Sequence, residues 1–143
     1  MTELFIVGFD GTEPSERAAR YAAVRAKAEG ANLHLLHVLE WSPYSFLTQD
    51  ELHDRHRRRN AELARAATIV EPMEQEIQAA GVTVTSEVRH GHAATVMCEV
   101  AKTTGATQMF VGRTGSSSLA ERLLGGLTFT LVQASPVPVT VVP

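Results

Sequence analysis

The sequence predicts an α/β fold: an open five-stranded parallel sheet with the strand order 3-2-1-4-5 and helices on both faces, a Rossmann-like architecture. Apolar runs of strand length alternate along the chain with stretches of helical length. The first run, at 4–9, is apolar throughout, as in a strand buried on both faces. Strands that alternate with helices in this way are joined by right-handed crossovers, which makes the sheet parallel.

The first half of the chain predicts two strands and the helix between them. The run at 4–9 is the first strand, and Pro14 suits the first turn of the alanine-rich helix that we expect at about 14–29. Gly30 ends this helix, because glycine readily adopts the left-handed conformation that closes a helix. The segment 32–39 is the second buried strand.

A long helix and a strand follow. Thr48 and Glu51 have the spacing of a capping box, so we expect a helix to begin there and to run to Gly81. Pro72 falls inside it and predicts a kink, because proline removes a backbone donor. The segment 82–88 alternates apolar and polar residues, which is typical of a strand near the edge of a sheet.

The last part of the chain completes the alternation. A helix over about 93–104 ends at Gly105, and a fourth strand covers 108–112. A last helix lies within 126–134, and a fifth strand covers 137–142. The sequence is therefore expected to form nine elements that begin and end with a strand.

Composition limits the class of protein. The length of 143 residues suits one domain spanning 1–143. A net charge of −3 gives no electrostatic reason to expect nucleic acid as a partner. One cysteine excludes an internal disulfide framework. The N-terminus lacks a basic signal-peptide region and no apolar run is long enough for a membrane span, so we expect a cytoplasmic protein.

The histidines do not predict a metal site. His34 and His37 are three apart on a strand, so their side chains should point to opposite faces of the sheet. His90 and His92 stand on either side of Gly91, where no third ligand is in view.

The segment VGRTGSSSLAERLLGG, at 111–126, is the main candidate for a ligand site. Open parallel sheets bind ligands beyond the strand ends where the strand order reverses, here between the strand that ends at Asp10 and the strand that ends at Gly112. Glycines leave backbone N–H groups open to an anion, and a helix N-terminus adds unpaired donors. The alternative is that these glycines only form tight turns.

The spacing of the glycines resembles that of a known family. The segment is neither a Walker A loop nor a GxGxxG fingerprint. It closely resembles the ATP-binding universal stress proteins, whose G-2x-G-9x-G-[S/T] pattern falls on Gly112, Gly115 and Gly125. The aspartate that closes the first strand and the LLHV of 35–38 agree with this resemblance, which covers essentially the whole chain and implies an adenine nucleotide α hydrolase-like fold.

The resemblance implies ATP as the ligand. It places the adenine and ribose near Asp10 and the backbone of Val38, with Gly8 and Phe9 on the same wall. It places the phosphates against Gly112, Arg113, Gly115, Ser116, Ser117, Gly125, Gly126, Leu127 and Thr128. Asp10 could also help to coordinate a Mg²⁺ shared with the phosphates, and its alternative role is to cap the turn before the first helix.

The chain departs from the family pattern at Gly126, where relatives carry Ser or Thr. If the backbone there is helical, Gly126→Ser should tighten ATP binding by adding a hydroxyl donor. If φ is positive there, the added Cβ should strain the turn. Thr128 could already supply the missing hydroxyl.

Two classes of function follow. The first hypothesis is an ATP-binding regulatory module in stress responses, acting on a partner such as a membrane transporter or another regulatory protein. The resemblance also implies a homodimer, or a higher oligomer, through strand 137–142. The alternative is an enzyme that slowly hydrolyses ATP or transfers a phosphoryl or nucleotidyl group. No phosphate-loop lysine and no positioned base is evident, so no catalytic residue is assigned.

Overall fold

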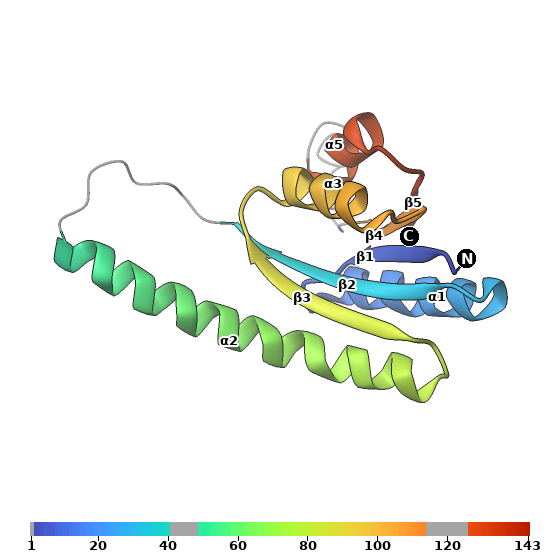
Figure 1. The fold of residues 1–143 in the computed structure, drawn as a ribbon, viewed down its shortest axis with the longest axis horizontal. Helices are drawn as coiled ribbons and strands as arrows, with labels where there is room; N and C mark the ends of the chain where they lie inside the picture. Colours follow the sequence, from blue (N-terminus) through green and yellow to red (C-terminus); the bar gives the residue numbers. More distant parts are fainter. Residues whose placement is uncertain (1, 41–48, 114–125) are drawn as a thin grey trace.

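The computed structural model describes residues 2–40, 49–113 and 126–143. A five-stranded parallel sheet has the strand order β3-β2-β1-β4-β5, as predicted, with α1 and α2 against one face and α3 and α5 against the other (Figure 1). The elements are β1 (Leu4–Gly8), α1 (Glu13–Glu29), β2 (Asn32–Leu39), α2 (Gln49–Ala79), β3 (Val84–His90), α3 (Ala93–Thr104), β4 (Gln108–Gly112), α5 (Leu127–Ala134) and β5 (Val139–Val142).

The sheet separates two hydrophobic cores. Successive side chains of a strand point to opposite faces, so Phe5 and Val7 of β1 pack toward α1 and α2 while Ile6 packs toward α3 and α5. All three are buried. This burial on both faces explains the continuously apolar sequence of β1.

Helix α1 is fixed at both ends by local signals. The Thr12 side chain caps its N-terminus by accepting from the Ser15 N–H, and Gly30 closes its C-terminus in the left-handed conformation. A face of small residues, mostly alanine, is buried against the sheet. These small side chains let the helix lie close to the strands, at the side of the candidate ligand crevice.

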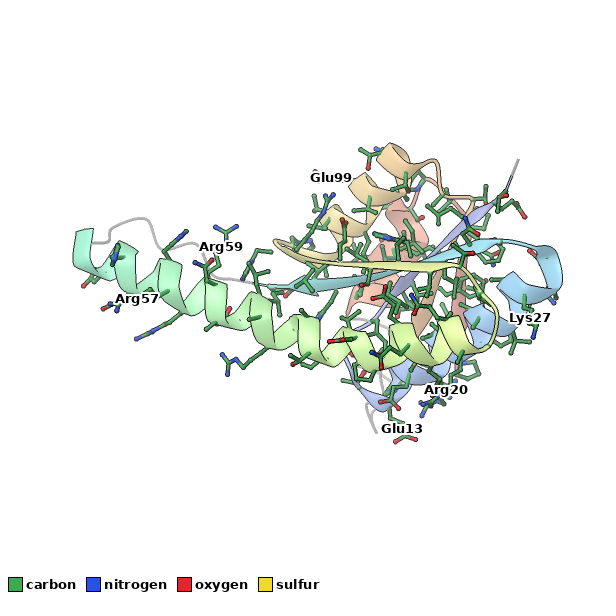
Figure 2. All side chains as sticks on the ribbon, turned by 60° about the horizontal axis from the view of Figure 1, so that its bottom comes forward. Glu13, Arg20, Lys27, Arg57, Arg59 and Glu99 are labelled. Atoms are coloured by element: carbon green, nitrogen blue, oxygen red, sulfur yellow. The ribbon has the colours of Figure 1, made fainter. Side chains whose placement is uncertain are left out.

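Helix α2 makes its apolar contact with the sheet through its second half. Its buried residues Ala66, Val70, Met73 and Ile77 recur at helical spacing. The preceding part projects beyond the sheet, and Arg57 lies on this projection (Figure 2). Of the basic run at 55–59, Arg59 donates a hydrogen bond of 3.3 Å to Nδ1 of His90 at the end of β3. The helix continues through Pro72 over 31 residues.

Several predicted boundaries differ from the observed ones by one or two residues, among them the end of β1, which is Gly8 rather than residue 9, and the end of β3, which is His90 rather than residue 88. Strand β3 begins at Val84 rather than at 82, because the Val82 N–H still bonds back to the Ile77 carbonyl at the end of α2. Strand β5 begins at Val139 rather than at 137; the preceding Pro138 has no N–H and contributes only its carbonyl, which accepts from Met109. Helix α5, Leu127–Ala134, lies within the predicted range of 126–134.

Within the described ranges, no helix combines the length and the apolar content that a membrane span needs.

Candidate functional site

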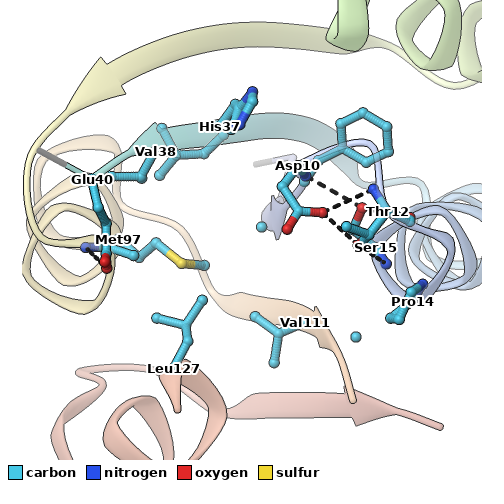
Figure 3. Close-up of a pocket in the computed structure, with 15 residues that line it drawn as sticks. Asp10, Thr12, Pro14, Ser15, His37, Val38, Glu40, Met97, Val111 and Leu127 are labelled. Atoms are coloured by element: carbon cyan, nitrogen blue, oxygen red, sulfur yellow. Dashed lines mark hydrogen bonds between the residues drawn. The ribbon is translucent and has the colours of Figure 1, made fainter. Parts of the chain in front are cut away.

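A cavity of about 260 Å³ lies where the carboxyl ends of β1 and β4 meet the first turn of α1 and the starts of α3 and α5 (Figure 3). This is the strand-order reversal at which the sequence placed a ligand. The described residues that line it and were named from the sequence are Gly8, Phe9, Asp10, Val38, Gly112 and Leu127. The described residues that sequence reasoning missed are Thr12, Pro14, Ser15, Leu36, His37, Glu40, Ala93, Met97 and Val111.

The other predicted site residues lie elsewhere. Arg113 and Thr128 are described but are not among the cavity-lining residues. Gly126 lies in an adjacent hollow at the N-terminal ends of α3 and α5, which it shares with Glu40 and His92. The predicted contacts at Gly115, Ser116, Ser117 and Gly125 fall outside the described residues.

Asp10 is held by the turn that joins β1 to α1. Its Oδ1 accepts from the Thr12 backbone N–H at 3.0 Å and from the Thr12 hydroxyl, while its own N–H donates to the Ser15 hydroxyl (Figure 3). Partial burial is the largest single influence and raises the Asp10 pKa, but the hydrogen bonds from Thr12 and Ser15 together outweigh it, so the pKa lies below 3.8. The cavity therefore presents a fixed carboxylate at neutral pH. The same turn caps α1, so the two roles predicted for Asp10 are compatible.

His37 is buried beside this turn. Its side chain points away from Val111 and Leu127, toward the face covered by α2 (Figure 3). Its Nδ1 is buried and has no hydrogen-bond partner among the described residues. Burial lowers the His37 pKa below 6.5, and the nearby Asp10 charge only partly offsets this. His34 hydrogen-bonds Thr85 on the opposite face, so these two histidines do not converge.

Glu40 lies at the far side of the cavity from Asp10. Its Oε1 accepts from the Ala93 N–H at 3.3 Å, at the start of α3 (Figure 3). The N-cap residue His92 offers no side-chain cap, so Glu40 satisfies a helix donor from a distant strand. Apolar side chains of Val38 and Met97 lie between the two carboxylates. None of the described lining residues is a lysine or an arginine.

Two glycines that line the cavity have packing roles. A Cβ on Gly112 would lie 2.3 Å from the backbone oxygen of Pro14, so only glycine lets the first turn of α1 rest on the end of β4. A Cβ on Gly8 would lie 2.9 Å from the terminal methyl of Met97, which is flexible and can move. The first glycine of the predicted motif therefore has a reason to be glycine that is independent of any ligand.

Gly126 does not have the helical backbone that its predicted place in the last helix requires. It is the N-cap residue of α5, with φ of 92° and ψ of 174°. Essentially only glycine adopts this combination, because a side chain would collide with the backbone. Of the two outcomes set out for Gly126→Ser, strain in the turn is the one that the structure favours. The pattern of the sequence carries no signal for the sign of this angle.

The comparisons with known proteins agree with the geometry. The sequence model of the universal stress protein family matches residues 1–143. The chain belongs to the universal stress protein family. A universal stress protein of Mycolicibacterium smegmatis is 30% identical over 146 residues, which are 96% of this chain and 47% of that protein, so the chain spans about half its length. Universal stress protein YxiE of Bacillus subtilis is 27% identical and is matched over 99% of both chains.

Solved structures share the fold of this universal stress protein. UspA of Lactobacillus plantarum superposes with a TM-score of 0.82 at 21% identity, covering 99% of this chain and 97% of that one. A universal stress protein in complex with cAMP gives 0.76 at 23% identity, covering 99% and 96%. An Arabidopsis thaliana family protein with AMP bound gives 0.66 at 16% identity, covering 98% and 90%. At these identities the likeness establishes the fold.

Proposed function

We propose that this universal stress protein is a regulatory module that binds an adenine nucleotide, ATP in preference to AMP, in the cavity between β1 and β4. The observation that carries the proposal is the fixed Asp10 carboxylate beside an apolar wall at the strand-order reversal. The cAMP and AMP found in two structural neighbours support the choice of ligand class.

The described residues fit the two ends of a nucleotide. Val38, Met97, Val111 and Leu127 offer an apolar surface to a flat base. The Asp10 carboxylate can accept hydrogen bonds from ribose hydroxyls, or take part in holding a Mg²⁺ that neutralises the phosphates. Because the described lining carries carboxylates and no cation, we assign the phosphates to the side of Gly112 and the start of α5.

Calorimetry with ATP, AMP and cAMP, with and without Mg²⁺, tests the proposal. We expect Asp10→Asn to weaken ATP binding about tenfold or more, because a hydrogen bond to a charged group contributes about 1.5–3 kcal/mol. Glu3→Gln is the matched control, since Glu3 is an exposed acid just before the start of β1, at the opposite end of the strand. The absence of nucleotide binding to the wild type, or an Asp10→Asn variant that binds like the wild type, would overturn the proposal.

A second variant tests the glycine segment. Gly115→Asp should abolish ATP binding with the fold intact, because it introduces a negative charge where the proposal places the phosphates. Equal affinities of the wild type for ATP and AMP would mean that the glycine segment does not bind the distal phosphates.

We also propose that the regulatory form is a homodimer built on the edge of β5. Strand β5 is a sheet edge, and Val139 and Val141 on it are only partly buried. Helices α1 and α5, which both contact β5, expose the large apolar side chains of Tyr21, Val24, Phe129 and Val132. Analytical ultracentrifugation at micromolar concentration tests this, and a monomer in the presence of ATP would contradict it.

A further inference from the structure

Helix α2 contacts the turn that carries Asp10 through the side chain of Ile69. A Cβ built on Gly11 would lie 2.4 Å from Cγ2 of Ile69, so this methyl group occupies the space that a side chain at position 11 would need. Gly11 has a φ of 82°, a conformation that side-chain-bearing residues rarely adopt. The turn is therefore shaped by glycine to receive Ile69.

Ile69 and Gly11 line a cleft of about 290 Å³ between α1 and α2. Phe9 lines both this cleft and the candidate nucleotide cavity, so the two hollows lie on opposite sides of the same turn. On the far side of the cleft, Arg20 of α1 donates two hydrogen bonds to Glu76 of α2, at 2.9 and 3.2 Å.

Ile69 lies at the edge of the core rather than inside it. Ile69 is 43% exposed, whereas its neighbours Val70 and Met73 are buried under α2. An aliphatic side chain this exposed contributes less by burial than its fully buried neighbours do. Its methyl is nonetheless pressed against the backbone of the residue between Asp10 and Thr12.

The two neighbours of Gly11 form the hydrogen bonds that orient the site. Asp10 accepts from the backbone N–H and the hydroxyl of Thr12, across Gly11 (Figure 3). A shift of the Gly11 backbone would change both bonds, because Gly11 is the residue that joins Asp10 to Thr12. The position of the Asp10 carboxylate is thus sensitive to what lies against Gly11.

We propose that Ile69 is a positioning residue for the nucleotide site, acting through Gly11 on Asp10. This inference rests on the proposed function and deepens it, because it connects occupancy of the cavity to α2. If the contact between the turn and α2 increases the affinity for nucleotide by some factor, then by linkage bound nucleotide stabilises that contact by the same factor. Bound nucleotide should therefore slow hydrogen exchange of α2 amides around Ile69.

Three variants of Ile69 test the role of the Cγ2 methyl. Ile69→Val keeps both branches at Cβ, Ile69→Leu keeps the volume but loses the β-branch, and Ile69→Ala loses both. We expect Ile69→Val to bind ATP like the wild type, and Ile69→Leu and Ile69→Ala to bind about three- to tenfold more weakly. Val24→Ala is the matched control, since Val24 is an exposed aliphatic residue on α1 at 69% exposure.

A second readout does not depend on nucleotide. Titration of the Asp10 carboxyl by NMR should show its pKa rising toward 3.8 in Ile69→Leu, because the hydrogen bonds from Thr12 loosen. Ile69→Leu with an unchanged ATP affinity, or with an unchanged Asp10 pKa, overturns the inference. A wild type that binds no nucleotide overturns the proposed function. The two failures can be told apart, because the Asp10 titration reports whether Ile69 positions the turn even when no nucleotide binds.

Discussion

Replacing Gly126 by serine restores the residue type of the family pattern, yet it should destabilise this protein. Serine is a favourable N-cap because its hydroxyl accepts from the first helical N–H groups, but it does so with a negative φ. Gly126 caps α5 with a φ of 92° and a ψ of 174°. A serine there must either accept this backbone conformation or shift the start of α5.

The magnitude follows from the backbone rather than from contacts. Apart from its own local backbone, a Cβ on Gly126 would meet no atom of the described residues within 4 Å, so no clash with another element of the described chain enters the estimate. Holding a side-chain-bearing residue in a glycine-only region costs about 1–3 kcal/mol. Two effects reduce this cost. Serine in place of glycine at an N-cap stabilises the helix by only a few tenths of a kcal/mol. The lower conformational entropy of the unfolded serine variant stabilises the folded state by about 0.4–1 kcal/mol more. With each contribution at the middle of its range, the net loss should be about 1 kcal/mol.

Thermal unfolding can detect this loss. For a chain of about this size, 1 kcal/mol shifts Tm by about 2–4 °C, so Gly126→Ser should lower Tm by several degrees. Asparagine provides a matched pair of variants. Gly105 also has a positive φ, of 70°, with open space around it, but its conformation is the left-handed one that asparagine tolerates.

Gly105→Asn should therefore leave Tm nearly unchanged, and Gly126→Asn should lower it even though asparagine is among the best N-cap residues. ATP affinity should fall in Gly126→Ser as well, because the start of α5 is displaced. A Gly126→Ser variant that is as stable as the wild type, or equal effects of asparagine at both positions, would refute this reasoning.

Two further predictions concern stability. In urea unfolding, Gly112→Ala should destabilise the protein by about 1–3 kcal/mol or more, since the backbone of Pro14 cannot move aside. Gly8→Ala should cost less, because the terminal methyl of Met97 can move. Equal losses of stability in the two variants would contradict this. His37 has a folded pKa below its unfolded value of 6.5, so the unfolded state binds more protons as pH falls below 6.5, and wild-type stability should decline there. His37→Leu should flatten this decline at little cost near pH 7.5, because Nδ1 has no hydrogen-bond partner to lose among the described residues; an unchanged slope would contradict the assignment.

The fold could be predicted because its signals are local and repeated. Burial on both faces gives β1 a continuous apolar run, and the period of Ala66, Val70, Met73 and Ile77 marks the packed face of α2. Boundaries were less certain where a residue serves two elements. Val82 follows α2 and precedes β3, and its hydrogen bond back to the helix is not visible in the alternation of the sequence.

The sequence by itself determined the parallel sheet, the strand order and the place where its order reverses. Asp10 and Gly112 could be assigned to that place because Asp10 closely follows β1 and Gly112 is the last residue of β4. The sequence did not reveal that Met97 and Glu40 line the cavity. The periodicity of its helix marks Met97 only as a core residue, and the pattern around Glu40 marks only the end of a strand.

Only the tertiary structure decided why individual glycines are glycine. The neighbour that forbids a side chain at Gly112 is the backbone of Pro14, and the neighbour of Gly11 is Ile69, each contributed by another helix. Periodicity and capping record the conformation of neighbouring residues, whereas these contacts depend on how separate elements pack. Glycine itself permits either sign of φ, so the backbone of Gly126 was fixed by the packing of the elements around it and not by its residue type.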